Sequence, residues 1–112
     1  MSAIDLAYLV LISDNDREFE EELLQVYIDD CQEHLQQAAL AIQSLAWENL
    51  AREAHHLKGA SGNVGAQEMQ SLALALETAA KAQDDSSSRD ALDRMQAKFE
   101  EVKQLFKERY RA

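Results

Sequence analysis

The sequence predicts an all-α protein, an up-and-down antiparallel four-helix bundle with an extra short N-terminal helix. Three observations lead to this prediction. The chain of 112 residues has no proline and only three glycines, and it is rich in alanine, leucine, glutamate and glutamine, which favour helices. Its apolar residues recur every three or four positions, as amphipathic helices require. Short links join four long stretches of this kind, which favours antiparallel neighbours.

The first two helices are predicted over residues 4–11 and 17–43. The first is apolar on more than one side, and we expect it to lie across one end of the bundle. The segment "SDND" at 13–16 separates them, and Asn15 followed by Glu18 resembles a capping box. One stripe of the second helix follows steps of four and three, which indicates one face toward a core. The stripe consists of Leu24, Ile28, Cys31, Leu35, Ala38, Ile42 and Leu45, and Phe19, Leu23, Val26 and Tyr27 widen its start.

The third and fourth helices are predicted over residues 46–64 and 66–82. The break before the third helix is placed by length, because one helix reaching residue 62 would span roughly 70 Å at 1.5 Å per residue. Ser44 is a plausible N-cap there, and Gly65 can take the left-handed conformation that ends a helix. The core-facing residues are Trp47, Leu50, Ala54, Leu57, Ser61 and Val64 in the third helix, and Met69, Leu72, Ala73, Leu76 and Ala80 in the fourth.

The last helix is predicted over residues 88–109, after a polar loop "QDDSSS" at 83–88. Ser87 with Asp90 resembles a second capping box. No internal repeat or second domain is visible, so residues 1–112 are predicted to be one domain. The core-facing residues of this helix are Leu92, Met95, Phe99, Val102, Phe106 and Tyr110.

Composition narrows the function classes. The formal net charge of −10 argues against nucleic acid as a partner, because its phosphates would be repelled. Cys31 is the one cysteine, which rules out an internal disulfide and favours a reducing compartment. No secretory signal or membrane-spanning stretch is visible. We therefore expect a cytoplasmic protein without membrane contact, monomeric by default, and Met1 mildly favours a free-standing chain.

The segment "AHHLKGASGNVGA" at 54–66 contains all three glycines of the chain. A projection at about 100° per residue places His55 at the edge of the buried stripe, on the same face as Lys58, Gly59 and Gly62. Each glycine inside a helix costs about 1 kcal/mol relative to alanine. A partner that brings its backbone close to His55 would explain that cost. Ala51, Glu48 and Arg52 share this face, and Arg52 belongs either to the partner site or to a Glu48–Arg52 pair.

An exposed histidine beside a cation suits a phosphoryl acceptor. Its ordinary pKa of about 6.5 leaves a neutral, nucleophilic nitrogen at cellular pH, and a nearby ammonium can neutralise phosphoryl oxygens. The sequence has no phosphate-binding loop and no metal cluster, so a partner must supply the other catalytic groups. Glu53 and His56 form the Glu-x-x-His pattern of di-iron bundles, but no second copy exists, so no metal site is expected.

The segment resembles the signature of histidine-containing phosphotransfer (HPt) domains, A-H-x-L-K-G-x-S-x-x-x-G-A around the phosphorylated histidine. The resemblance implies that His55 accepts a phosphoryl group through Nε2 from a receiver-domain aspartate and passes it to another receiver. It implies that Lys58 neutralises the phosphoryl oxygens and that Gly59 gives the receiver clearance. Glu77, 22 positions after His55, matches a family position that hydrogen-bonds the other ring nitrogen. The matching residues are His55, Leu57, Lys58, Gly59, Ser61, Gly65 and Ala66.

The resemblance also implies a phosphoryl carrier rather than an enzyme. Its partners would be response-regulator receivers, a hybrid histidine kinase, or both, and it would bind no cofactor, since the receiver brings Mg²⁺. A docking surface on the first three helices is implied, and we expect some of Ile4, Leu9, Ile12, Phe19 and Leu23 to stay partly exposed in it. The predicted partner-binding residues are Ala51, Arg52, Gly59, Gly62, Ile12, Phe19 and Leu23.

Two other functions stay open. Glutamate at position 77 also resembles the phosphodonor domains of chemotaxis kinases, which a kinase loads, but Val64 stands where those domains usually have an aromatic residue. A helical adaptor that is never phosphorylated is the other. Glu77 could also be a merely solvated helix residue. His34 is expected to be exposed, and His56 to be a bystander, solvated or half-buried.

Overall fold

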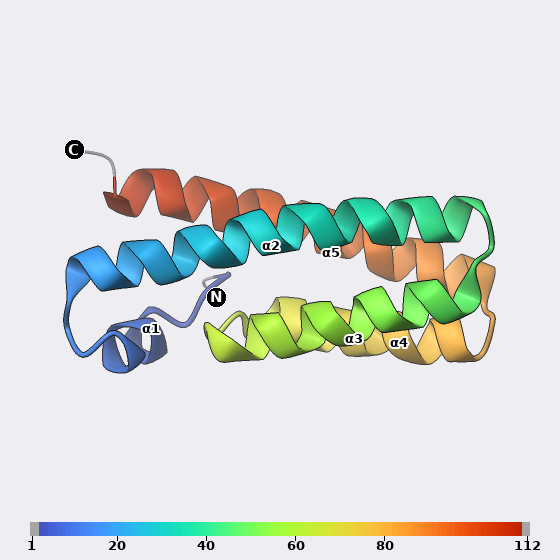
Figure 1. Ribbon diagram of the computed structural model, residues 1–112, viewed down its shortest axis with the longest axis horizontal. Coiled ribbons are helices and arrows are strands. Elements are labelled where there is room, and N and C mark those ends of the chain that lie inside the picture. The colour runs from blue at the N-terminus through green and yellow to red at the C-terminus, as the bar shows by residue number, and fades with distance from the viewer. Residues whose placement is uncertain (1–2, 111–112) are drawn as a thin grey trace.

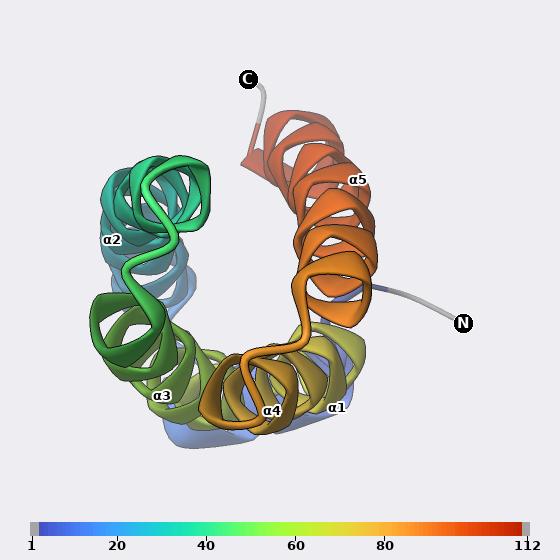
Figure 2. The same cartoon turned by 90° about the vertical axis from the view of Figure 1, so that its right-hand side faces the viewer.

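The computed structural model describes residues 3–110, and these residues form five helices. Figures 1 and 2 show the four long helices running up and down as an antiparallel bundle. Each long helix packs on the next one in the chain, and the last returns against the first of the four. The predicted all-α bundle is therefore confirmed. The helices are α1 (Leu6–Ile12), α2 (Arg17–Gln43), α3 (Trp47–Asn63), α4 (Gln67–Lys81) and α5 (Asp85–Tyr110).

The short helix α1 lies across one end of the bundle, as predicted (Figure 1). It occupies the space beyond α3 and α4, which have 17 and 15 residues where α2 and α5 have 27 and 26. The Asp5 amide donates to the Gly65 carbonyl at 2.9 Å, which ties α1 to the α3–α4 turn. Gly65 has a φ of +77°, and a Cβ there would meet the Tyr8 ring at 2.8 Å. The left-handed glycine thus lets α1 approach. Met1, on which the expectation of a free-standing chain rests, lies outside the described residues.

The cap before α2 differs from the prediction. Its N-cap is Asp16, whose carboxylate accepts the Phe19 amide at 3.1 Å. Asn15 instead takes a positive φ of 61° in the turn, so the Asn15–Glu18 capping box is wrong. A carboxylate is a strong acceptor for the free amides of a first helical turn.

The caps around α3 and α5 were also misplaced. Ser44 ends α2 instead of starting α3, and Leu45 makes the turn with a φ of 53°. The α5 helix begins at Asp85, earlier than predicted, because Asp84 accepts both the amide (3.0 Å) and the hydroxyl (2.9 Å) of Ser87. The Ser87–Asp90 box is therefore wrong. In a polar loop with several possible capping residues, small differences in backbone geometry decide which residue becomes the N-cap.

The buried stripes agree with the predicted spacing, apart from the exposed Phe19, Val26 and Leu45 of the α2 stripe. Inside the bundle, the Tyr27 hydroxyl shares a 2.8 Å hydrogen bond with Ser61 on α3. Cys31 is fully buried, and burial raises the pKa of its thiol to about 12. The Cys31 thiol therefore serves as a packing group. The Tyr27–Ser61 hydrogen bond joins α2 to α3 inside the bundle.

Candidate functional site

His55 projects from the outer edge of α3. Its side chain is 70% exposed, while Ala54 and Leu57 beside it are fully buried. The buried residues hold the helix in place and set the direction in which the imidazole points. The helical projection made from the sequence is confirmed for this residue.

The neighbouring helix α4 supplies a carboxylate to the imidazole. Oε2 of Glu77 lies 3.0 Å from Nδ1 of His55, and the Glu77 side chain is only 8% exposed. A carboxylate accepts hydrogen bonds only, so Nδ1 carries the proton and Nε2 of a neutral ring has the lone pair. Within residues 3–110, Nε2 has no hydrogen-bond partner. The alternative of Glu77 as a solvated residue is wrong.

Two lysines hold Glu77 in its ionised form. Nζ of Lys58 donates to Oε1 at 2.7 Å, and Nζ of Lys81 lies 3.6 Å from Oε2. The hydrogen bond from Lys58 is the main cause that lowers the pKa of Glu77 below its usual value, against burial, which raises it. His55 and Lys81 lower this pKa further. The carboxylate can therefore stabilise positive charge on the imidazole.

The two glycines on this face of α3 have different surroundings. A Cβ on Gly59 would have no neighbour within 4 Å, so the helix is open to a partner there. A Cβ on Gly62 would lie 2.7 Å from Nε2 of Gln70 on α4. Gly62 therefore makes room for a side chain of the same molecule, and the empty surface predicted over both glycines exists only at Gly59.

The other predicted partner residues differ in exposure. Ala51, Ile12 and Leu23 are half-buried, and Phe19 is 44% exposed. Arg52 is exposed and donates to the Asn49 side chain, whereas among residues 3–110 it forms no ion pair with Glu48.

The five apolar residues considered for the docking surface differ in burial. Ile4 and Leu9 are fully buried against the bundle, whereas Ile12, Phe19 and Leu23 stay partly exposed. The expectation that some of these five residues would be partly exposed is therefore confirmed by the last three. The apolar groups that α1 and α2 do present to solvent include Tyr8, Leu11 and Val26, which periodicity alone did not single out.

His56 and His34 form a second polar group on the other side of α3. Nε2 of His56 contacts Asp30 on α2 at 2.7 Å, and Nδ1 of His34 contacts Glu53 on α3 at 2.5 Å. His34 is half-buried at 23% exposure, so its predicted exposure was wrong. Neither side chain is hydrogen-bonded to His55. The sequence carried a weak signal for this group, the four-residue spacing of Asp30 and His34.

Comparison with known proteins agrees with this geometry. The model of the Hpt domain family matches residues 22–105. The chain resembles histidine-containing phosphotransfer protein B (HptB) from Pseudomonas aeruginosa PAO1 at 27% identity, with a TM-score of 0.88 and 97% of each chain covered. The Hpt domain of a sensor hybrid histidine kinase from Shewanella shares the fold at 19% identity, with a TM-score of 0.75 over 96% of this chain and 97% of that one. The search of curated proteins found no match.

The antiparallel helical bundle with an exposed histidine, together with the match to the Hpt domain model, places the chain in the class of histidine phosphotransfer proteins. The chain belongs to the Hpt domain family. Its role is histidine phosphotransfer in two-component phosphorelays. Proteins of this family are phosphoryl carriers rather than catalysts, and they work with receiver domains and hybrid kinases. Within residues 3–110, none of the helices has the length and apolar character needed to cross a membrane.

Proposed function

We propose that His55 is the phosphoryl acceptor of this protein and that its Nε2 is the attacking atom. The observation that carries the proposal is the 3.0 Å contact between Nδ1 and Glu77 under a ring that is 70% exposed. It fixes one nitrogen as a donor and leaves the lone pair of the other facing solvent. His56 and His34 lack such a free Nε2, because both contact Asp30.

The transfer step follows from this arrangement. Nε2 of His55 attacks the phosphorus of an aspartyl phosphate on a receiver. The N–P bond forms, the P–O bond to the aspartate breaks, and the aspartate carboxylate leaves with the electron pair. Nδ1 keeps its proton, so the ring becomes cationic, and the buried Glu77 carboxylate stabilises that charge. The reverse step returns the phosphoryl group to a second receiver.

Lys58 and Gly59 serve the same step. The Lys58 ammonium now binds Glu77 at 2.7 Å, and it lies one helical turn from His55, within reach of phosphoryl oxygens. The open surface at Gly59 admits the receiver. Mg²⁺ and the remaining acidic groups would come from that receiver. Phe19, Ile12, Leu23, Ala51 and Arg52 would complete the docking surface around the histidine.

A transfer assay tests the proposal. The protein is mixed with a phosphorylated receiver, and acid-labile, base-stable phosphoryl label is measured on wild type, His55→Gln and His56→Gln. We expect label on wild type and on His56→Gln and none on His55→Gln. Equal label on His55→Gln would overturn the assignment. Loading by an isolated kinase domain but by no receiver would favour the kinase-loaded phosphodonor, and receiver binding without any label would favour the unphosphorylated adaptor.

A further inference from the structure

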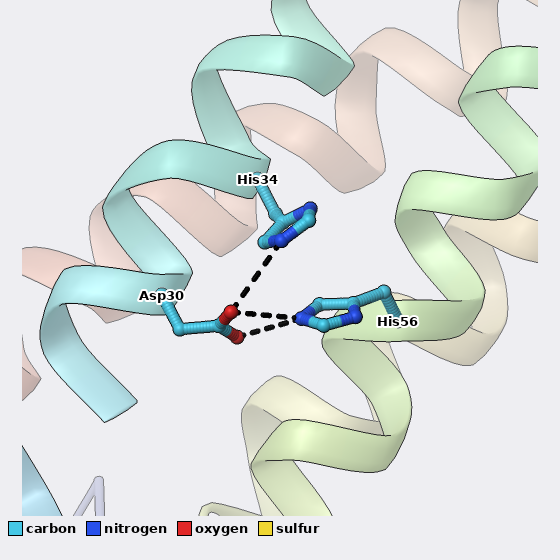
Figure 3. Close-up of side chains that lie close together, drawn as sticks. All are labelled: Asp30, His34 and His56. Carbon is cyan, nitrogen blue, oxygen red and sulfur yellow. Dashed lines mark hydrogen bonds and ion pairs between the residues drawn. The ribbon is translucent and has the colours of Figure 1, made fainter. Parts of the chain in front are cut away.

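A second group of metal-binding residue types joins α2 to α3, and the phosphotransfer site uses none of it. Asp30 and His34 lie one turn apart on α2, and His56 faces them from α3 (Figure 3). Each of the three offers one ligand atom, and these atoms lie within 4.8 Å of one another. Two helices that are already packed together therefore bring three donor atoms to one point.

The donor atoms lie close to the spacing that one bound ion requires. Nε2 of His56 lies 2.7 Å and 3.0 Å from the two Asp30 oxygens, and Nε2 of His34 lies 3.4 Å from one of them. Ligands about 2.1 Å from a tetrahedral ion are separated by about 3.4 Å. An ion would have to move the Asp30 oxygens back from Nε2 of His56. It would also have to turn apart the two imidazoles, which now stack with centroids 3.7 Å apart.

Glu53 adds the outer contact that such histidine ligands usually have. Its Oε2 lies 2.5 Å from Nδ1 of His34, so that nitrogen carries the proton and Nε2 is the one directed at Asp30. A carboxylate on the second nitrogen orients a ligating imidazole and raises its basicity. His34 and His56 keep 23% and 43% of their side chains exposed, which gives an ion a path to the site.

We propose that Asp30, His34 and His56 bind one divalent transition-metal ion, with zinc as the preferred occupant. Two imidazoles and one carboxylate suit zinc, whereas Mg²⁺ and Ca²⁺ select sites made wholly of oxygen. Three protein ligands leave the fourth position of a tetrahedral ion to water. In the sequence, the Glu53–His56 pattern had no second copy, so no metal site was expected. The other two ligands instead come from α2, where Asp30 and His34 are four residues apart. The bound ion would fasten α2 to α3.

A zinc titration of the full chain, prepared without a polyhistidine tag, tests this proposal. Isothermal titration calorimetry is expected to show one ion per chain, and the melting temperature is expected to rise with zinc concentration, since binding to the folded state stabilises it. His34→Gln and His56→Gln are each expected to weaken binding at least about tenfold. His55→Gln is the matched control, because it removes the adjacent histidine of the same helix and should leave zinc affinity unchanged.

Absence of zinc binding by wild type would overturn the proposal, as would loss of binding in His55→Gln with binding kept in His56→Gln. If a glutamine variant fails to fold by circular dichroism, Asp30→Asn and the Co²⁺ complex of wild type decide. A tetrahedral Co²⁺ absorption spectrum that Asp30→Asn abolishes supports the site, and an unchanged spectrum rejects it. The phosphotransfer assay reads His55 separately, so the two proposals can fail independently.

Discussion

Two adjacent histidines on α3 face different helices and have different surroundings. His55 turns toward α4, where Glu77 contacts Nδ1 and leaves Nε2 free in a side chain that is 70% exposed. His56 turns toward α2, where Asp30 contacts Nε2 and the ring stacks on His34. One residue of separation, about 100° around the helix, decides this difference. The proposed choice of His55 as nucleophile therefore rests on its unpartnered Nε2, because both residues are histidines.

Replacing the carboxylate beside His55, with a carboxylate of the His34–His56 group as the control, tests that comparison most strongly. Glu77→Ala frees Nδ1 and removes the counter-charge of the phosphorylated ring, so the rate of transfer from a phosphorylated receiver should fall about 10- to 100-fold. Glu53→Ala, which removes the carboxylate beside His34, should leave that rate unchanged. Stopped-flow or quenched-flow measurement of label transfer gives both rates.

Glu77→Gln separates positioning from simple support of the fold. Its amide oxygen can still accept from Nδ1, so most of the rate lost in Glu77→Ala should return. The nitrogen chemical shifts of His55 should likewise report the Nδ1-protonated ring in wild type and in Glu77→Gln, and a tautomer mixture in Glu77→Ala. A rate equally low in both variants would contradict the positioning role.

The pH dependence of stability gives a smaller effect at the same residue. The folded pKa of Glu77 lies below its ordinary value of 4.5, so its stabilisation is complete above that value and is lost as pH falls through the folded pKa. Glu77→Gln should lower the free energy of unfolding at pH 7 by about 1.5 kcal/mol. Below pH 4.5, the acid-induced loss of stability should be shallower in the variant than in wild type.

Urea denaturation across the acidic range measures this difference. Glu48→Gln is a suitable control, because Glu48 is exposed and forms no ion pair within residues 3–110. Parallel stability curves for wild type and Glu77→Gln would show that the buried carboxylate does not contribute in this way.

The sequence predicted the helices well because burial repeats along each helix. Residues such as Leu24 and Leu35 recur at helical spacing and are buried in the structure, and the α2 bounds were predicted correctly. The caps were harder to predict. Asn15 and Asp16 are both good N-caps, and only the path of the turn selects Asp16.

The surroundings of His55 and of His56 show the same limit of prediction from sequence. The dense motif around His55 and the matching position of Glu77 were sufficient to predict the contact that the structure contains. The group of Asp30, His34 and His56 depends on how α2 and α3 pack, and no local motif records that register. Gly62 was misread for the same reason, because its neighbour Gln70 comes from another helix.

The glycines provide the last and smallest test of the open side of α3. In Gly59→Ala the new methyl group meets nothing within 4 Å, so better helix propensity should raise the free energy of unfolding by about 1 kcal/mol. That change corresponds to about 4–8 °C in melting temperature. In Gly62→Ala the methyl group must displace the Gln70 amide, 2.7 Å away, and the gain should be smaller. If a receiver docks over Gly59 as proposed, the stabilised Gly59→Ala protein should accept phosphoryl more slowly than wild type. Faster or equal transfer would mean that the receiver does not approach His55 across this part of the helix.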